Sequence, residues 1–168
     1  MRRALVSFLV LALSSTWAAA QQNRIGVGAH YWKTLDQIDV NDFDESGVGY
    51  VVSYQRTGGQ WTKLEFDVEI LPDGYGGSTN TAFSPQLFLL VGSGLYAGAG
   101  VGIDYLNDEF QDEPFYALRL GFEVLLLPSI YLDVNANYRF KEFKDIQTLT
   151  ETIDTDVITL GAQLRLQF

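Results

Sequence analysis

WTKLEFDVEIL, residues 61–71, alternates apolar and charged side chains along almost its whole length. Successive side chains of a β-strand point to opposite faces of the sheet. The alternation therefore predicts a strand with one apolar face and one charged face. The charged face carries Lys63, Glu65, Asp67 and Glu69.

The same two-residue period recurs on both sides of this stretch. It is clear in residues 130–139, which place Asp133 and Arg139 on the polar face, and in residues 158–168, which place Arg165 there. With weaker segments included, the sequence predicts about eight strands, each near the 9–11 residues that a tilted membrane-spanning strand needs. The weaker segments are Arg24–Trp32, Val48–Arg56, Phe83–Val91, Leu95–Tyr105 and Tyr116–Leu126.

The predicted connections alternate between short and long. Residues 57–60, 92–94 and 127–129 are short and hold tight-turn residues such as Gly, Pro and Ser. The long connections fall at every other junction, which puts all long loops at one end of a barrel and all short turns at the other. Outer-membrane barrels have this asymmetry, with short turns facing the periplasm. The long connections are residues 33–47, 72–82, 107–114 and 141–156.

Residues 1–20 have the pattern of a secretory signal peptide. Arg2 and Arg3 precede an apolar stretch from Leu5 to Leu13, and three alanines end at Ala20. The apolar stretch is shorter than the roughly 20 residues of a spanning helix. We therefore expect a signal peptide over residues 1–20 and one barrel domain over residues 21–168.

Charge and composition exclude several kinds of protein. Removal of residues 1–20 takes two of the 11 basic residues and none of the 21 acidic ones, which changes the net charge from −10 to −12. Such a surface repels nucleic acid, so no nucleic-acid partner is expected. The chain has no Cys, which excludes disulfide scaffolds and thiolate metal sites. No cofactor signature is present.

Alternation alone leaves two all-β folds open. A secreted lipocalin-like carrier would enclose its apolar face around a ligand, whereas a transmembrane barrel turns that face to lipid. Three features favour the antiparallel up-and-down transmembrane barrel: the chain stops within a strand pattern, aromatic residues lie near the ends of the apolar stripes, and the polar face is rich in glycine, which fits a narrow interior. The aromatic residues are Tyr31, Tyr54, Tyr105, Tyr138, Phe140 and Phe168, and the glycines are Gly26, Gly28, Gly49, Gly98, Gly100, Gly102, Gly121 and Gly161.

Two short motifs carry a resemblance to a known family. The last strand, with Leu160, Ala162, Leu164 and Leu166 on one face and a terminal Phe168, is similar to the C-terminal signature of outer-membrane proteins. The segment 95–102, LYAGAGVG, resembles a strand common in small OmpA-like and OmpX-like barrels. The resemblance implies an eight-stranded outer-membrane barrel whose Leu160, Leu164, Leu166 and Phe168 are recognised by the barrel assembly machinery.

The lumen of an eight-stranded barrel is nearly filled by side chains, so its charged residues are expected to pair with one another. This predicts a structural or surface-interaction scaffold with a plugged polar lumen. A surplus of acids leaves a narrow or gated channel for ions or small solutes as the alternative. The expected lumen network is Lys63, Glu65, Asp67, Glu69, Asp104, Arg119, Glu123, Asp133, Arg139 and Arg165.

A lipid A-modifying enzyme is a second alternative, because such barrels use a His with a Ser and an acid. His30 is the only histidine, and the candidate serines are Ser46, Ser78 and Ser84. None of them lies in a recognisable motif, so the sequence favours a protein that is not an enzyme and assigns no catalytic residue.

The long loops are strongly acidic, which solvation alone explains. A sharper hypothesis is that divalent cations bridge their carboxylates to phosphates of the outer-membrane lipids. No loop has the spacing of a calcium-binding hand, so no metal-ligand set is assigned. We expect a monomer. The loop acids are Asp36, Asp39, Asp42, Asp44, Glu45, Asp108, Glu109, Asp112, Glu113, Glu151, Asp154 and Asp156.

Overall fold

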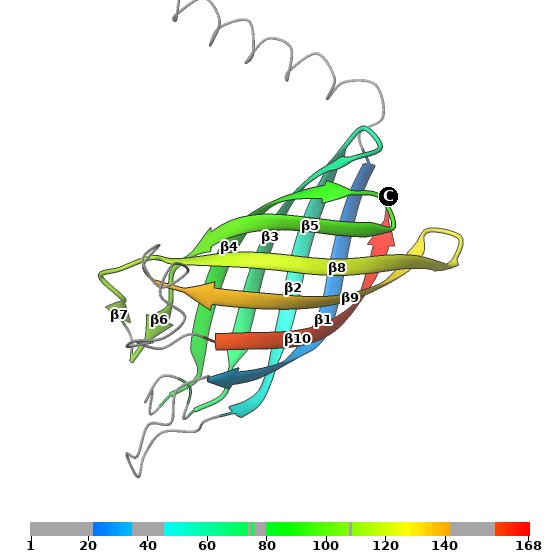
Figure 1. Ribbon diagram of the computed structural model, residues 1–168. Helices are drawn as coiled ribbons and strands as arrows, with labels where there is room; N and C mark the ends of the chain where they lie inside the picture. Colours follow the sequence, from blue (N-terminus) through cyan, green and yellow to red (C-terminus); the bar gives the residue numbers. More distant parts are fainter. Residues whose placement is uncertain (1–21, 35–45, 74, 76–79, 108, 142–156) are drawn as a thin grey trace, which may run out of the picture.

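The computed structural model describes residues 22–34, 46–73, 75, 80–107, 109–141 and 157–168. They form one antiparallel sheet that closes into a barrel (Figure 1). Eight long strands make the wall, and the pairing of β3 with β4 completes the ring. The long strands are β1 (Gln22–Thr34), β2 (Ser46–Gly58), β3 (Thr62–Leu71), β4 (Ala82–Gly92), β5 (Leu95–Gly102), β8 (Phe115–Leu127), β9 (Ile130–Phe140) and β10 (Val157–Gln167).

The strand order follows the chain, as expected for an up-and-down barrel. Each long strand pairs with its sequence neighbour, and β1 pairs with β10 from Arg24 opposite Gln167 to Thr34 opposite Val157. The last residue also joins the ladder, because Phe168 and Asn23 exchange backbone hydrogen bonds of 2.9 and 3.4 Å. No helix among the described residues is long and apolar enough to cross a membrane.

Burial alternates along the strands with the predicted parity. In β10 every second residue from Val157 to Arg165 is buried, whereas Leu160 and Leu164 are at least half exposed. In β3 the charged residues from Lys63 to Glu69 are buried and Phe66 is exposed. The apolar face therefore points outward and the polar face inward, which excludes the lipocalin-like alternative. The eight glycines predicted for the polar face all have the inward parity.

The short turns lie together at one end of the barrel, here called the turn end. The opposite end, here called the loop end, carries the long connections (Figure 1). At the turn end Gly59 has φ +71, a conformation that glycine adopts without steric cost. β8 extends past its neighbour β5, which pairs with it only as far as Phe122, whereas β9 is paired with β10 from its first residue, Ile130. A β-bulge lies between Leu125 and Leu127.

The structure corrects the predicted fifth strand. β5 ends at Gly102, not at Tyr105, and the connection that follows forms a separate short hairpin of β6 (Tyr105–Leu106) and β7 (Glu109–Phe110). The rings of Tyr105 and Phe110 pack edge to face in it, with centroids 4.9 Å apart. This single aromatic contact stabilises a hairpin where alternation alone predicted a continuation of the fifth strand.

Phe140 was predicted to face the membrane, and this is wrong. Only 2% of its surface is exposed, and its neighbour Arg139 is buried as well. The alternation of β9 therefore ends at the last residue of the strand, at the loop end. Phe140 instead packs near Tyr138 and Tyr116, with ring centroids 5.7 and 5.9 Å apart.

Pro85 lies inside β4 without a bulge and without shortening the strand. It stays in register opposite Val68 of β3. Its carbonyl oxygen accepts a 3.2 Å hydrogen bond from the Ile103 backbone, whereas strand pairing of β4 with β5 begins only at Gln86. The donor that proline lacks would point to this side, where the pairing of β4 with β5 has ended and only Phe83 pairs further on, with Tyr105, so the missing hydrogen bond costs little.

Candidate functional site: the polar lumen

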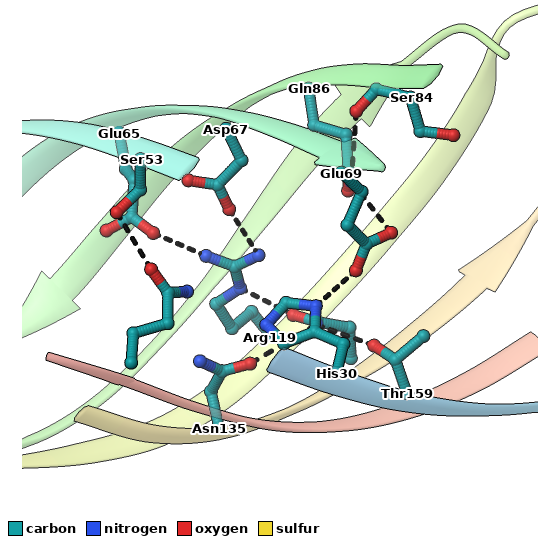
Figure 2. A network of polar contacts seen from close by, with 12 residues as sticks. His30, Ser53, Glu65, Asp67, Glu69, Ser84, Gln86, Arg119, Asn135 and Thr159 are labelled. Carbon is teal, nitrogen blue, oxygen red and sulfur yellow. Dashed lines mark hydrogen bonds and ion pairs between the residues drawn. The ribbon is translucent and has the colours of Figure 1, made fainter. Parts of the chain in front are cut away.

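The polar side chains that line the lumen form three groups along the barrel axis. The central cluster is Glu65, Asp67, Arg119, Asp133 and Arg165, contributed by β3, β8, β9 and β10. Each of these residues has the inward parity of its strand, which is why residues distant in the sequence meet here. Figure 2 shows Glu65, Asp67 and Arg119 of this cluster.

Glu65 lies at the centre of this cluster. It accepts hydrogen bonds from Arg119 Nη1 at 2.6 Å and from Arg165 Nη2 at 2.8 Å. Gln55 Nε2 donates to its second oxygen at 2.5 Å. A carboxylate held by two guanidinium groups is well stabilised, because hydrogen bonds between charged groups are roughly twice as strong as neutral ones.

Arg119 also donates to Asp67 Oδ2 at 2.7 Å and to Asn137 Oδ1 at 2.5 Å. Its guanidinium lies 3.7 Å from the ring centroid of Phe88, which covers its flat face. The side chains of Arg119, Glu65 and Asp67 are 0% exposed. These three side chains are therefore packed together inside the barrel, out of contact with solvent.

Asp133 extends the central cluster toward β9. It accepts hydrogen bonds of 2.7 Å from Tyr96 Oη and from Asn135 Nδ2, and Arg165 Nη2 lies 3.5 Å away. Two neutral donors thus hydrogen-bond the Asp133 carboxylate, which a buried charge needs.

The turn-end cluster is Arg24, Lys63 and Glu123. Glu123 Oε1 lies 2.8 Å from Arg24 Nη1 and 2.7 Å from Lys63 Nζ. Lys63 also donates to the Ser93 carbonyl at 3.0 Å. These residues line an open vestibule of about 630 Å³ at the turn end. Both cations are held in place within the wall of that vestibule.

The loop-end cluster is His30, Glu69 and Arg139. Glu69 accepts a hydrogen bond from Arg139 Nη2. It also pairs with His30 Nδ1 (Figure 2). His30 is fully buried, and its Nε2 atom has no hydrogen-bond partner in the described structure. A Cβ atom at Gly161 would meet the imidazole at 1.9 Å, so only glycine leaves room for His30 here.

Two titratable groups near the loop-end cluster lie outside the strands. Burial raises the pKa of the Asp104 carboxyl above its ordinary value, and the nearby Arg139 guanidinium opposes this rise. The Ser84 hydroxyl donates a hydrogen bond to Asp104. Burial also raises the pKa of the Tyr75 hydroxyl, which therefore stays protonated. Tyr75 covers the lumen by packing edge to face on Trp32, with centroids 5.0 Å apart.

The structure places the ten predicted lumen residues in or beside these three clusters. Asp104 differs from the others, because it follows the end of β5 and lies half-buried at the loop end. Sequence reasoning missed Arg24, Tyr96 and Tyr75. Arg24 and Tyr96 have the inward parity of their strands, so the alternation could have identified them. Arg24 also adds a positive charge to the lumen, which reduces the surplus of acidic residues predicted there. Tyr75 lies in a connection between strands, where no two-residue alternation predicts which way a side chain points.

Among the described residues, no serine forms a catalytic triad with His30 and an acid, as the enzyme alternative would require. Ser46 is exposed, and Ser84 is engaged with Asp104. Ser78 lies outside the described residues. No described serine is hydrogen-bonded to the His30 imidazole, whose Nδ1 pairs with Glu69. Within the described ranges no group of three or more His, Asp or Glu residues could hold a metal ion.

The closed antiparallel barrel, apolar outside and polar inside, defines a transmembrane β-barrel of the small outer-membrane class. Its outward residues form a continuous apolar band, which is the surface that such a barrel presents to lipid. Fold and surface together place the protein in an outer membrane.

Solved structures of this class are similar to nearly the whole chain. Neisserial surface protein A has a TM-score of 0.57 and 13% identity, over 88% of this chain and 97% of that chain. The N-terminal β-barrel domain of OprF from Pseudomonas aeruginosa has a TM-score of 0.56 and 12% identity, over 89% and 100%. OprG from the same organism has a TM-score of 0.56 and 12% identity, over 89% and 96%. At these identities the likeness shows the fold alone.

No family model matches the sequence, and no curated protein matches it.

Proposed function

We propose that the protein is a non-conducting outer-membrane scaffold that presents its long loops at the cell surface. The observation that carries this proposal is the central cluster, in which Arg119 and Arg165 both contact Glu65 across the lumen. An eight-stranded barrel is just wide enough for side chains to fill. Ion pairs with fully buried side chains leave no water-lined path through that level.

Planar-bilayer recording tests the closed lumen. We expect no conductance steps from the purified, refolded protein. The variant Arg119→Gly is the matched comparison, because it removes one of the two arginine side chains of the central cluster. Steps in the unaltered protein that change in size in Arg119→Gly would show that the chain itself conducts, and the scaffold proposal would then be wrong.

The C-terminal strand supports a role in assembly. Leu160, Leu164 and Leu166 are about half exposed, and Phe168 is 70% exposed at the turn end. We propose that this strand end is read by the barrel assembly machinery. Phe168→Ala should then lower the amount of folded protein in cells while leaving refolding in detergent unchanged. Equal losses in both settings would indicate a stability effect instead.

Cation binding by the loops stays a proposal. Glu109, Asp112 and Glu113 are exposed at the loop end, and the acids of residues 36–45, Asp108 and residues 151–156 lie outside the described residues. If Ca²⁺ or Mg²⁺ bridges these carboxylates to lipid phosphates, a chelator lowers the melting temperature in vesicles that contain lipopolysaccharide. Identical melting curves would remove the idea.

A further inference from the structure

A second cavity lies at the loop end, outside the central cluster. Its volume is about 260 Å³, which is below the range of about 300–1,000 Å³ typical of sites for drug-sized ligands. A ligand that fills it is therefore a small molecule. The residues used in the argument below are Asp104, Glu113, Phe115, Arg139, Phe140 and Lys141, all of which line this cavity.

Arg139 gives the cavity a buried cation. Only 3% of Arg139 is exposed, and Nη2 pairs with Glu69 while Nη1 lies 3.4 Å from Tyr75 Oη. Its Nε atom is buried and has no hydrogen-bond partner in the described structure. Leaving a buried donor unpaired is unfavourable, so an acceptor supplied by a ligand is favoured here. A carboxylate is the acceptor that suits a guanidinium best.

Asp104 gives the cavity an anion. Its one hydrogen bond among the described contacts is the one from Ser84, a neutral donor. Burial raises the pKa of this carboxyl, which means that the charged form lacks full compensation. A ligand ammonium beside Asp104 would supply it.

The other charges of the cavity balance these two. Among the described lining residues, Lys141 adds a second cation and Glu113 a second anion. Arg139 Nη2 is already paired with Glu69, which leaves Nε as the donor that a ligand can use. A ligand with one positive and one negative group matches both pairs.

Four of the remaining described lining residues are apolar, namely Leu106, Phe115, Phe140 and Val157. Phe115 and Phe140 are 5% and 2% exposed. Leu106 and Val157 belong to the same apolar part of the lining. The Phe115 ring lies 4.9 Å from the Arg139 guanidinium, so the apolar side begins directly beside the buried cation. An aliphatic group attached close to the ligand carboxylate would contact these rings and gain hydrophobic stabilisation.

We propose that this cavity binds a small zwitterion with an apolar side chain, of the chemical class of the free aliphatic amino acids. The ligand carboxylate lies at Arg139 and Lys141, its ammonium at Asp104 and Glu113, and its side chain against Phe115 and Phe140. The cavity lies at the loop end and does not include the central cluster, so binding does not require an open path through the barrel.

Isothermal titration of the refolded barrel with L-leucine tests the proposal. We expect saturable binding, weakened at least tenfold for N-acetyl-L-leucine, which lacks the ammonium, and for L-leucinamide, which lacks the carboxylate. A tenfold change corresponds to about 1.4 kcal/mol. Equal binding of all three compounds would show a merely apolar pocket, and no binding of leucine would show no such site; either result overturns the proposal.

Variants locate the site. Asp104→Asn should weaken leucine at least tenfold but leave N-acetyl-L-leucine unchanged, while Asp112→Asn, on the same connection but outside the cavity lining, should change neither. Lys141→Gln serves as a second variant if Asp104→Asn does not fold, and it should weaken leucine while sparing leucinamide. Unchanged leucine affinity in the folded variants would overturn the proposed site, whatever the bilayer recordings show.

Discussion

Arg119 Nη1 lies 2.6 Å from Glu65 Oε1, although the two residues are 54 positions apart and belong to strands that are not neighbours in the wall. Only closure of the barrel brings β3 and β8 face to face across the lumen. This pair therefore forms only in the closed barrel. The free energy that it contributes depends on whether the lumen excludes water.

Arg119→Gln should destabilise the protein strongly. Glu65 would keep Arg165, but Asp67 would lose its only ion-pair partner among the described contacts. Breaking a buried pair by removing one member costs about 3–5 kcal/mol. Urea unfolding in detergent micelles measures the change. Lys33→Gln, at an exposed position of β1, is the control and should stay within about 0.5 kcal/mol; an equally small effect at Arg119 would mean that water fills the lumen.

Gly161→Ala should be destabilising because of a single close contact. A Cβ atom at position 161 would lie 1.9 Å from His30 Cδ2, so the imidazole must move away from Glu69. Overpacking of this kind costs about 1–3 kcal/mol. The double variant Gly161→Ala with His30→Ala should cost less than the sum of the two single changes. Gly94→Ala is the control, since its Cβ would meet only a backbone oxygen at 3.9 Å.

Alternation in the sequence was enough to predict the barrel and the inward direction of Glu65, Arg119 and Arg165. It fails where the chain leaves the wall. Phe140 follows the outward parity of Tyr138 yet is buried, because β9 ends there. Tyr75 and the hairpin of β6 and β7 belong to connections, where side-chain direction depends on tertiary contacts. The pairing partners of each charge could not be predicted either, since they depend on the stagger between non-adjacent strands.

The amide of Leu125 should exchange with solvent much faster than that of Gly121. Glu123 donates to Gly94 at 2.9 Å, and β8 has no strand on that side beyond this point. Because backbone donors two residues apart point the same way, the Leu125 amide faces the open edge, whereas Gly121 is paired with Tyr96. We expect a difference of at least about tenfold by NMR hydrogen exchange. Equal protection of both amides would indicate that another chain covers this edge.

Stability should depend on pH through Asp104. Its pKa is raised in the folded protein, so the folded state binds its proton more tightly than the unfolded chain does. The stabilising contribution of this group is present below about pH 4, its unfolded value, and is lost as the pH rises through the folded value. Asp104→Asn removes this dependence. The free energy of unfolding of the native protein relative to Asp104→Asn should therefore fall from acid toward neutral pH, and a rise would contradict the assigned burial.

Two outward leucines should differ according to their depth in the membrane. Leu120 lies in the middle of β8 and is 58% exposed, while Leu95 begins β5 beside a short turn and is 72% exposed. An arginine on the lipid face costs about 2–4 kcal/mol at the midplane and about 0–1 near the interfaces, because a side chain near the edge reaches water. Leu120→Arg should accordingly lose several times more unfolding free energy than Leu95→Arg when both are unfolded from lipid vesicles by guanidinium. In detergent micelles, which thin and deform around a charge, the two losses should move closer together. Equal losses in vesicles would mean that β8 does not cross the hydrocarbon region at the level of Leu120, and the apolar band would then have to face something other than lipid.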